Sequence, residues 1–344
     1  MAWKGIIQMK NLVLPKDYKS ALSLRETQIA IKLIKDTFQK KLSEALNLDR
    51  ITAPIIVTSG SGINDDLNGV ERKVTFTVKE MNGGECEVVQ SLAKWKRMAL
   101  YRYGYEPDSG IYTDMNAIRR DDDMDNLHSI FVDQWDWERI ITREERNTEF
   151  LKSVVKKIAS CVARTLEIVK KDFPSVSVNI SDDVTFVTTQ ELEDMYPELS
   201  PKERENAFVK EHPTTFLMQI GGKLKSGIKH DGRAADYDDW SLNGDLLFWN
   251  DVLGCAFEIS SMGIRVDEKS LDEQLKICGN EERRKYKYHS MILNNELPLT
   301  IGGGIGQSRM CMLLLGKAHI GEVQVSVWSD EMINTCSEHG ITLL

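Results

Sequence analysis

The stretch SIFVDQWDWERII, residues 129–141, alternates polar and apolar residues in the manner of a β-strand. Successive side chains of a strand point to opposite faces of a sheet. One face would therefore carry Gln134, Asp136 and Glu138, and the other would carry two tryptophans. A solvated sheet face would also explain the acidic residues, but polar groups among aromatic ones favour the floor of a ligand-binding cavity.

The segments around this strand predict strands that follow one another in clusters. Residues 111–119 form a second strand across the polar loop 120–127, so a long hairpin is expected. Further strands are predicted at residues 51–57, 74–78, 87–90, 215–220, 245–249 and 255–266. Helices are predicted at residues 23–46, 92–101 and 148–172, from Ser200 onward, from Ser270 to near Gly279, and at residues 286–293 and 305–315. This order favours a mostly antiparallel sheet with helices packed on it, an α+β fold.

The composition limits the classes of function. The chain has 344 residues with a formal net charge of −9, which argues against coating nucleic acid or an anionic membrane. No apolar run has the length of a membrane span and the start lacks a secretory signal, so a cytoplasmic location without a membrane partner is expected. The six cysteines form no Cys-x-x-Cys pair and are interpreted as reduced thiols. We expect an N-terminal arm, residues 1–22, and a single domain, residues 23–344.

The segment GGGIGQSR, residues 302–309, is rich in glycine and precedes a predicted helix. Backbone N–H groups at a helix N-terminus could hold an anion, and Arg309 would add a planar cation. A tight turn is the alternative interpretation. The spacing fits neither a P-loop nor a dinucleotide-binding fingerprint.

Acidic residues are concentrated in DYDDW (236–240), in LNGD (242–245) and at Glu258. Glu258 lies in an apolar strand, where an unpaired carboxylate would be costly. Magnesium held by one or two carboxylates and by the phosphates of a nucleotide would remove that cost. The run Asp121–Asp123 is interpreted instead as a solvated loop.

Several of these stretches together resemble the ammonia-dependent asparagine synthetases, the aspartate–ammonia ligase family. They are QSLAKWKR (90–97), LHSIFVDQWDWER (127–139), DYDDW (236–240), LNGD (242–245), FEISSMGIRV (257–266) and IGGGIGQSRM (301–310). The family is in turn similar to the catalytic domain of class II aminoacyl-tRNA synthetases. The resemblance implies a homodimer with a central, mostly antiparallel sheet of six to eight strands flanked by helices.

The resemblance also implies a reaction. L-aspartate would attack the α-phosphorus of ATP through its β-carboxylate, giving β-aspartyl adenylate and pyrophosphate, and ammonia would then displace AMP. Residues implied for aspartate are Ser91, Lys96, Gln134, Asp136, Ser260 and Ser261, and Asp238 is a further candidate for binding the substrate or the metal. Residues implied for the nucleotide are Arg119, His128, Phe131, Asp245, Glu258 and Arg309, with Asp245 and Glu258 on Mg²⁺. Because aspartate has a carboxylate at each end, Lys96 and Arg119 are expected to hold the α-carboxylate, and Asp136 to recognise the ammonium group.

The resemblance assigns Asp65, in GSGINDDLNG, to the ammonia step, with Arg119 and Arg309 as the other catalytic residues. A carboxylate would attract ammonium and accept its proton; a loop aspartate in a turn is the alternative. No cysteine precedes Cys86, so we expect ammonia rather than glutamine as the nitrogen donor.

Two other functions remain open at this stage. One is a truncated aminoacyl-tRNA synthetase. Two expectations argue against it: the net charge is acidic, and the single expected domain leaves no second domain that could read tRNA. The other is a non-catalytic, synthetase-like regulator that binds an amino acid or a nucleotide.

Overall fold

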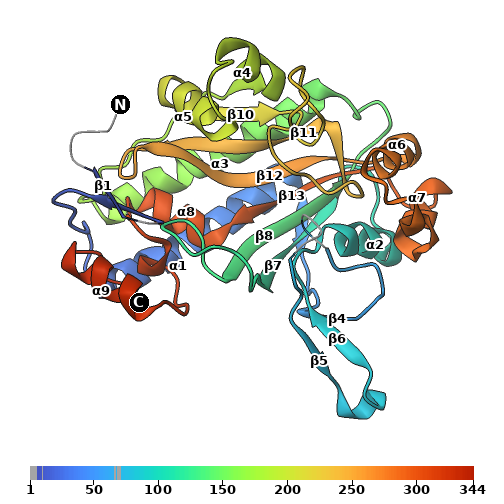
Figure 1. Ribbon diagram of the computed structural model, residues 1–344, viewed down its shortest axis with the longest axis horizontal. Coiled ribbons are helices and arrows are strands. Elements are labelled where there is room, and N and C mark those ends of the chain that lie inside the picture. Colours follow the sequence, from blue (N-terminus) through green and yellow to red (C-terminus); the bar gives the residue numbers. More distant parts are fainter. Residues whose placement is uncertain (1–5, 10, 66, 68–70) are drawn as a thin grey trace.

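The computed structural model describes residues 6–9, 11–65, 67 and 71–344. Its centre is an eight-stranded sheet with the strand order β3-β7-β8-β13-β12-β11-β10-β9 (Figure 1). The strands are β3 (Leu48–Arg50), β7 (Gly110–Ile118), β8 (Phe131–Ile140), β9 (Thr185–Thr188), β10 (Thr214–Met218), β11 (Asp238–Asn250), β12 (Cys255–Arg265) and β13 (Thr300–Gly306). Only the two edge pairs, β3 with β7 and β10 with β9, are parallel. The predicted α+β fold with a mostly antiparallel sheet is confirmed.

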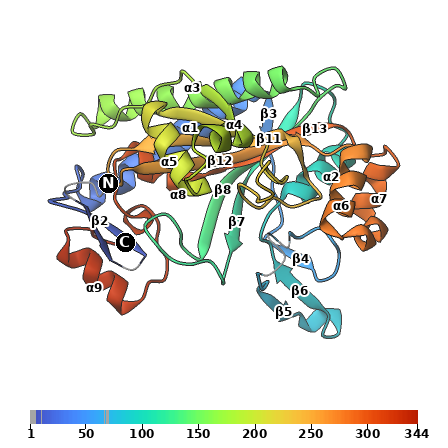
Figure 2. The same ribbon diagram turned by 45° about the horizontal axis from the view of Figure 1, so that its top comes forward.

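Three helices cover one face of the sheet (Figure 2). They are α1 (Leu24–Leu46), α3 (Thr148–Asp172) and α8 (Gln307–Leu314). The alternation of β8 sends Trp135 and Trp137 to this side, where both side chains are fully buried. The ring of Phe38 from α1 lies 4.7 Å from that of Trp135. The apolar half of the alternating stretch therefore anchors the sheet to its longest helices.

The opposite face is covered only at its ends. The helices α4 (Thr189–Met195) and α5 (Pro201–Glu211) pack on β10 and β11. The other end is covered by α2 (Ala93–Tyr103) and, beside it, by α6 (Glu268–Cys278) and α7 (Lys287–Leu293). The middle of this face is left open, and the polar residues of β8 point into it.

Smaller elements surround this body. The strands β4 (Ile56–Thr58), β5 (Thr75–Thr77) and β6 (Glu85–Val88) form a separate sheet that projects from it (Figure 1). The strands β1 (Ile6–Met9) and β2 (Leu12–Pro15) pair with each other, and α9 (Asp330–Glu338) lies near the C-terminus. Leu12 and Leu14 of the expected N-terminal arm are buried in the main core. Residues 1–5 and 10 of that arm lie outside the described part of the chain.

Local sequence signals predicted most of the element boundaries. The helix expected from Ser23 begins there, with a capping box between Ser23 and Glu26. The helix expected to begin at Ser270 begins earlier, because its N-cap is Asp267. Ser270 is the N3 residue that completes the capping box with Asp267. The strand expected at residues 51–57 is wrong, since β3 ends before it and β4 begins at its far end. The elements β1, β2, β3, β9, α4 and α9 were not anticipated.

The glycine-rich segment was also misassigned. Gly302–Gly304 were expected to form a turn or a loop before a helix, but they lie inside β13, which runs between β8 and β12. Their backbone groups serve the sheet, and α8 begins only at Gln307. The first turn of α8 is occupied by the protein itself, because Ser308 N–H donates to the Asp133 carboxylate at 3.0 Å. The predicted anion site at this helix N-terminus is therefore wrong.

None of the helices in the described ranges combines the length and the apolar character that crossing a membrane requires.

The contact between Phe38 and Trp135 gives a test of the main core. We expect Phe38→Ala to lower the free energy of unfolding by about 3–5 kcal/mol, since it leaves a cavity under the sheet. Ile277→Ala on α6 is the control, because Ile277 is 68% exposed and its truncation should change stability by less than about 0.5 kcal/mol. Denaturant unfolding monitored by circular dichroism measures both values. Similar losses for the two variants would contradict the assignment of the core.

Candidate active site

The open middle of the sheet forms the floor of a cavity of about 660 Å³. Its walls come from α2, the loop after β7, the segment before β11 and the loop that follows β4. The predicted site residues that border it are Asp65, Ser91, Lys96, Arg119, His128, Phe131, Gln134, Asp136, Asp238, Glu258, Ser261 and Arg309. Ser260 and Asp245 do not border it. Segments distant in the sequence thus converge on one cavity.

The glycines of β13 make room for the polar residues of the floor. Gly302, Gly304 and Gly306 lie opposite Glu138, Asp136 and Gln134 of β8. A Cβ atom on Gly302 would overlap the Glu138 carboxylate, and one on Gly304 would overlap the Gln134 amide. The glycine run is therefore a strand over which side chains of neighbouring strands can lie, and not a cradle for phosphate.

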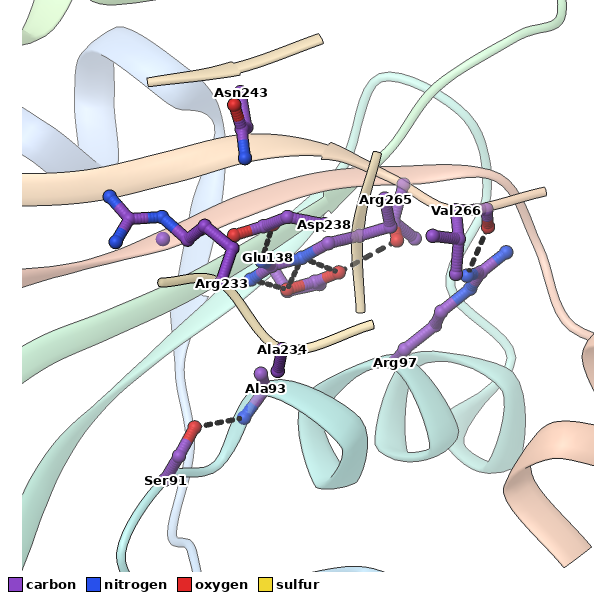
Figure 3. A network of polar contacts seen from close by, with 12 residues as sticks. Ser91, Ala93, Arg97, Glu138, Arg233, Ala234, Asp238, Asn243, Arg265 and Val266 are labelled. Carbon is purple, nitrogen blue, oxygen red and sulfur yellow. Dashed lines mark hydrogen bonds and ion pairs between the residues drawn. The ribbon is translucent and has the colours of Figure 1, made fainter. Parts of the chain in front are cut away.

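Arg265 joins three strands across this gap. Its guanidinium lies between the carboxylates of Glu138 and Asp238 (Figure 3). Nε donates to the two Glu138 oxygens at 3.0 and 3.1 Å, and Nη2 donates to Oε2 at 2.8 Å. Glu138 also accepts a hydrogen bond from Thr300 Oγ1 at 2.7 Å. All of these groups are buried, so their charges are balanced by one another rather than by water.

Lys96 makes a second buried pair beside Arg265. Its Nζ donates to the Asp136 carboxylate, to Trp137 O at 2.9 Å and to Gly303 O at 3.2 Å. Burial lowers the pKa of Lys96 and raises that of Asp136, while the charge of each partner opposes the shift of the other. The two residues implied for aspartate are thus bonded to each other in the structure.

The floor carries an excess of negative charge. Three buried carboxylates, those of Asp136, Glu138 and Asp238, face two cations, Lys96 and Arg265. A low-dielectric site with one uncompensated negative charge favours a ligand that brings a positive group. The floor therefore suits a substrate ammonium group.

A β-bulge in β12 determines that Ser261, and not Ser260, borders the cavity. Leu246 and Leu247 of β11 lie opposite Ser260 and Glu258 of β12, so Ile259 is an extra residue. The bulge places Glu258 and Ser261 on the same cavity even though they are three residues apart. Ser260 is buried, and its Oγ has no hydrogen-bond partner within the described ranges. The structure therefore does not place Ser260 with the other predicted residues.

A chain of polar contacts borders the end of the cavity near β12. Arg309 Nη1 donates to Glu258 O at 3.1 Å, and Nη2 lies 2.7 Å from His128 Nε2. His128 Nδ1 lies 2.9 Å from Asp125 Oδ1. A neutral imidazole that donates from Nδ1 and accepts at Nε2 satisfies both contacts. Arg309 is thus held over the cavity between a backbone carbonyl and an imidazole.

Asp245 and Glu258 lie on adjacent strands near Arg233. Asp245 is buried and hydrogen-bonded to the Arg233 guanidinium, which borders the cavity. Burial raises the pKa of Asp245, and the charge of Glu258 adds to the rise while Arg233 opposes it. Burial acts in the same direction on Glu258, but Arg309, Arg233 and Lys202 outweigh it and lower its pKa. Two carboxylates that repel each other fit a magnesium ion that also binds phosphate oxygens.

Arg119 and Asp65 face the cavity with unused hydrogen-bonding capacity. Arg119 Nε is buried and finds no hydrogen-bond partner among the residues that the structure describes, and its Nη2 is 3.5 Å from Gln90 O. Asp65 Oδ1 accepts from Leu67 N at 3.2 Å, while Oδ2 is buried and has no partner among the described residues. Burial raises the pKa of Asp65, against the opposing charges of Lys94 and Arg119. A guanidinium and a carboxylate are thus both available to ligands.

Asn64 holds Asp65 in this position. Its Nδ2 donates to Glu87 Oε2 at 2.9 Å and to Val88 O at 3.1 Å. Its Oδ1 accepts from Asp65 N at 3.0 Å and from Gln90 N at 2.8 Å. The loop that carries Asp65 is therefore attached to β6 and to the segment that leads into α2.

Among the residues that border the cavity, Arg233, Tyr237 and Arg265 were missed as site residues. Arg265 ends the apolar run of FEISSMGIR, and a charged residue at the end of a buried strand was a usable signal. Asp238 meets Arg265 only because β11 is irregular between Asp238 and Asn243, which no spacing rule predicts. Asp121–Asp123 are partly or fully exposed, as expected for a solvated loop, but they also border the cavity.

The sequence is similar to one protein family over most of its length. The model of the aspartate–ammonia ligase family matches residues 25–340. An aspartate–ammonia ligase of Clostridium tetani is 60% identical over 97% of this chain and 98% of its own length. The corresponding ligase of Ligilactobacillus salivarius is 58% identical over 97% of this chain and its full length, 100%.

Solved structures of aminoacyl-tRNA synthetases share the fold at low sequence identity. Asparaginyl-tRNA synthetase of Pyrococcus horikoshii, complexed with asparaginyl-adenylate, has a TM-score of 0.63 at 16% identity, covering 87% of this chain and 68% of that one. Aspartyl-tRNA synthetase of Entamoeba histolytica has a TM-score of 0.60 at 18% identity, covering 89% and 59%. The expected class II synthetase-like fold is confirmed, and this likeness shows the fold alone.

The glycine strand provides a test of the site. We expect Gly302→Ala to separate Arg265 from Glu138, because the added methyl group would occupy the position of the carboxylate. The free energy of unfolding should fall by about 1–3 kcal/mol. Gly222→Ala is the matched control, since a Cβ atom at Gly222 meets nothing within 4 Å. Denaturant unfolding compares the two, and equal stability of both variants would disprove the packing role of Gly302.

Proposed function

The chain belongs to the aspartate–ammonia ligase family, and we propose that it makes L-asparagine through a β-aspartyl adenylate, with release of AMP and pyrophosphate. One observation carries the proposal: a guanidinium nitrogen of Arg119 and a carboxylate oxygen of Asp65, both without a hydrogen-bond partner in the described part of the chain, belong to residues that border the same cavity as the Lys96–Asp136 pair. These three features match a phosphate, an ammonium ion and a zwitterionic amino acid.

Aspartate would bind by opening the Lys96–Asp136 pair. Its α-ammonium group would take the place of Lys96 on Asp136, and its α-carboxylate would bind Lys96 and Arg119. One ion pair within the protein is thereby replaced by two between protein and substrate. Gln134, Ser261, Ser91 and Asp238 border the same space and would complete the subsite.

In the first step, a β-carboxylate oxygen of aspartate attacks the α-phosphorus of ATP and the bond to pyrophosphate breaks. Arg119 would bind the α-phosphate, and its planar guanidinium can follow the charge that develops on the phosphoryl oxygens. Arg309, oriented by His128 and Glu258, would hold the nucleotide from the other end, where Phe131 also borders the cavity. No general base is required, because the attacking carboxylate is ionised.

We propose Mg²⁺ as the metal cofactor, held by Glu258 and Asp245 together with the phosphates. When bound, it would neutralise phosphate charge. In the structure Arg233 is hydrogen-bonded to Asp245. When the metal is bound, Arg233 would give up this hydrogen bond and bind the phosphates.

In the second step, ammonium would bind Asp65 Oδ2 and give it a proton. The resulting ammonia attacks the acyl carbon of the adenylate, the bond to the phosphate oxygen breaks, and AMP leaves with the bonding electrons. The attacking nitrogen loses its extra proton to the phosphate of AMP or to water, which gives the neutral amide. The raised pKa of Asp65 brings this carboxylate closer to the range in which it can accept a proton at neutral pH.

We also propose a homodimer that works in the cytoplasm with ATP as co-substrate. The edge strand β3 has no strand on its outer side within the described ranges, and Leu24 and Ile29 of the adjacent α1 are more than half exposed. A second copy of the chain could cover this edge.

An activity assay tests the adenylate mechanism. Purified protein with aspartate, ATP, Mg²⁺ and ammonium chloride, without tRNA, is expected to yield asparagine and AMP in equal amounts. Aspartate-dependent exchange between pyrophosphate and ATP is expected in the absence of ammonia. Formation of ADP, or the absence of exchange, would rule out the adenylate.

The role of Asp65 predicts that the two steps can be separated. Asp65→Asn should retain most of the pyrophosphate exchange, while asparagine formation falls by about 10²–10⁴-fold, because the variant can neither attract nor deprotonate ammonium. Asp123→Asn is the control, as Asp123 borders the mouth of the cavity but is exposed. Equal losses in both reactions for Asp65→Asn would refute its assignment to the ammonia step.

A further inference from the structure

A cluster of ionisable side chains, three of them buried, lies next to the loop that carries Asp65, and neither of the two proposed steps involves it. Lys94 projects from the first turn of α2, is 3% exposed, and its Nζ lies 3.0 Å from Asp236 Oδ2. Arg283 Nη1 and His289 Nε2 also lie 3.0 Å from the same oxygen. Asp236 is fully buried, and none of these four residues borders the cavity.

Lys94 is also connected to the backbone next to Asp65. Its Nζ donates to Asn64 O at 3.4 Å, which places the ammonium group one peptide unit from Asp65. The side chain of Asn64 fixes the N–H of Asp65, as described above. Lys94 therefore holds both the position and the electrostatic environment of this carboxylate.

We propose that Lys94, anchored by Asp236, is a positioning residue for the ammonia step that keeps Asp65 oriented and ionised. The inference rests on the proposed function, because it presumes that Asp65 is the proton acceptor. Asp236 thereby acquires a role in DYDDW different from that of Asp238, which faces the substrate side.

The charged groups around Asp65 make the inference specific. Lys94 approaches from α2, Arg119 from the end of β7, and Asp236 and Tyr237 from the segment before β11. Burial is the largest influence and raises the pKa of Asp65, and Lys94 is the strongest charge that opposes it, while Asp236 adds to the rise. Removing the charge of Lys94 should raise this pKa further, and removing that of Asp236 should lower it.

The direction of these effects can be measured. A higher pKa keeps Asp65 protonated, and so unable to accept a proton, up to a higher pH. For Lys94→Met we expect the acidic limb of kcat/KM for ammonia to move to higher pH by about one unit, which is a loss of about tenfold on that limb. The ratio to the unsubstituted enzyme should recover at alkaline pH. Lys94→Arg, which keeps the charge, should largely restore the profile.

Asp236→Asn is the second variant and has the opposite expectation, a shift of the limb to lower pH. Pyrophosphate exchange without ammonia serves as the internal reference for folding and for the first step in every variant. The proposal holds if asparagine formation falls more than exchange in Lys94→Met and if the two variants shift in opposite directions. Unshifted limbs, shifts of the same sign, or equal losses in both reactions would overturn it.

The Asp65→Asn variant separates this inference from the proposed function. If Asp65→Asn still forms asparagine at the normal rate, the ammonia-step assignment itself is wrong, whatever Lys94 does. If Asp65→Asn stops that step and Lys94→Met leaves its pH profile unchanged, only the role of Lys94 is wrong.

Discussion

The meeting of Arg265 and Glu138 across β13 is the constraint on which the rest of the site depends. These residues belong to strands that are not neighbours, and their side chains touch because Gly302 lies between them without a side chain. The pair fixes the carboxylate of Glu138, which also faces Lys96 at 3.8 Å. Lys96 in turn holds Asp136. A strand of glycines therefore organises a connected network of charges on the floor of the cavity.

The charges of the cavity are arranged by sign along its length. The floor has an excess of carboxylates and suits an ammonium group, whereas Arg119 and Arg309 present cations where phosphate would bind. Part of the excess acid of the chain, whose net charge is −9, thus lies in groups that we propose to bind cationic ligands. Arg119 and Arg309 supply local positive charge for phosphate groups, so a protein with a negative net charge can still bind ATP.

The sequence predicted which faces of the strands would be polar, but not how the strands align. The alternation in SIFVDQWDWERII correctly placed Gln134, Asp136 and Glu138 on one face, because a strand period is a local property. Gln134 and Asp136 border the cavity, and Glu138 contacts Lys96 and Arg265 beside them. The use of Ser261 rather than Ser260 depends on the bulge at Ile259, which arises from pairing with β11. The glycine run was misread because glycine is typical of loops, and its function here comes from side chains of two other strands.

The proposed role of Asp65 would explain how a shared fold can carry a distinct second step. The floor of the cavity belongs to the large sheet, which has the class II synthetase-like arrangement. Asp65 instead lies in the loop between β4 and β5 of the small projecting sheet, attached to the body through Asn64 and Lys94. Burial disfavours the charged form of a carboxylate and raises its pKa. The carboxylate then accepts a proton more readily, provided that nearby cations keep it ionised beforehand. Under the proposed function, the loop that carries Asp65 would therefore determine the nucleophile, and the adenylate chemistry would depend on the residues of the large sheet.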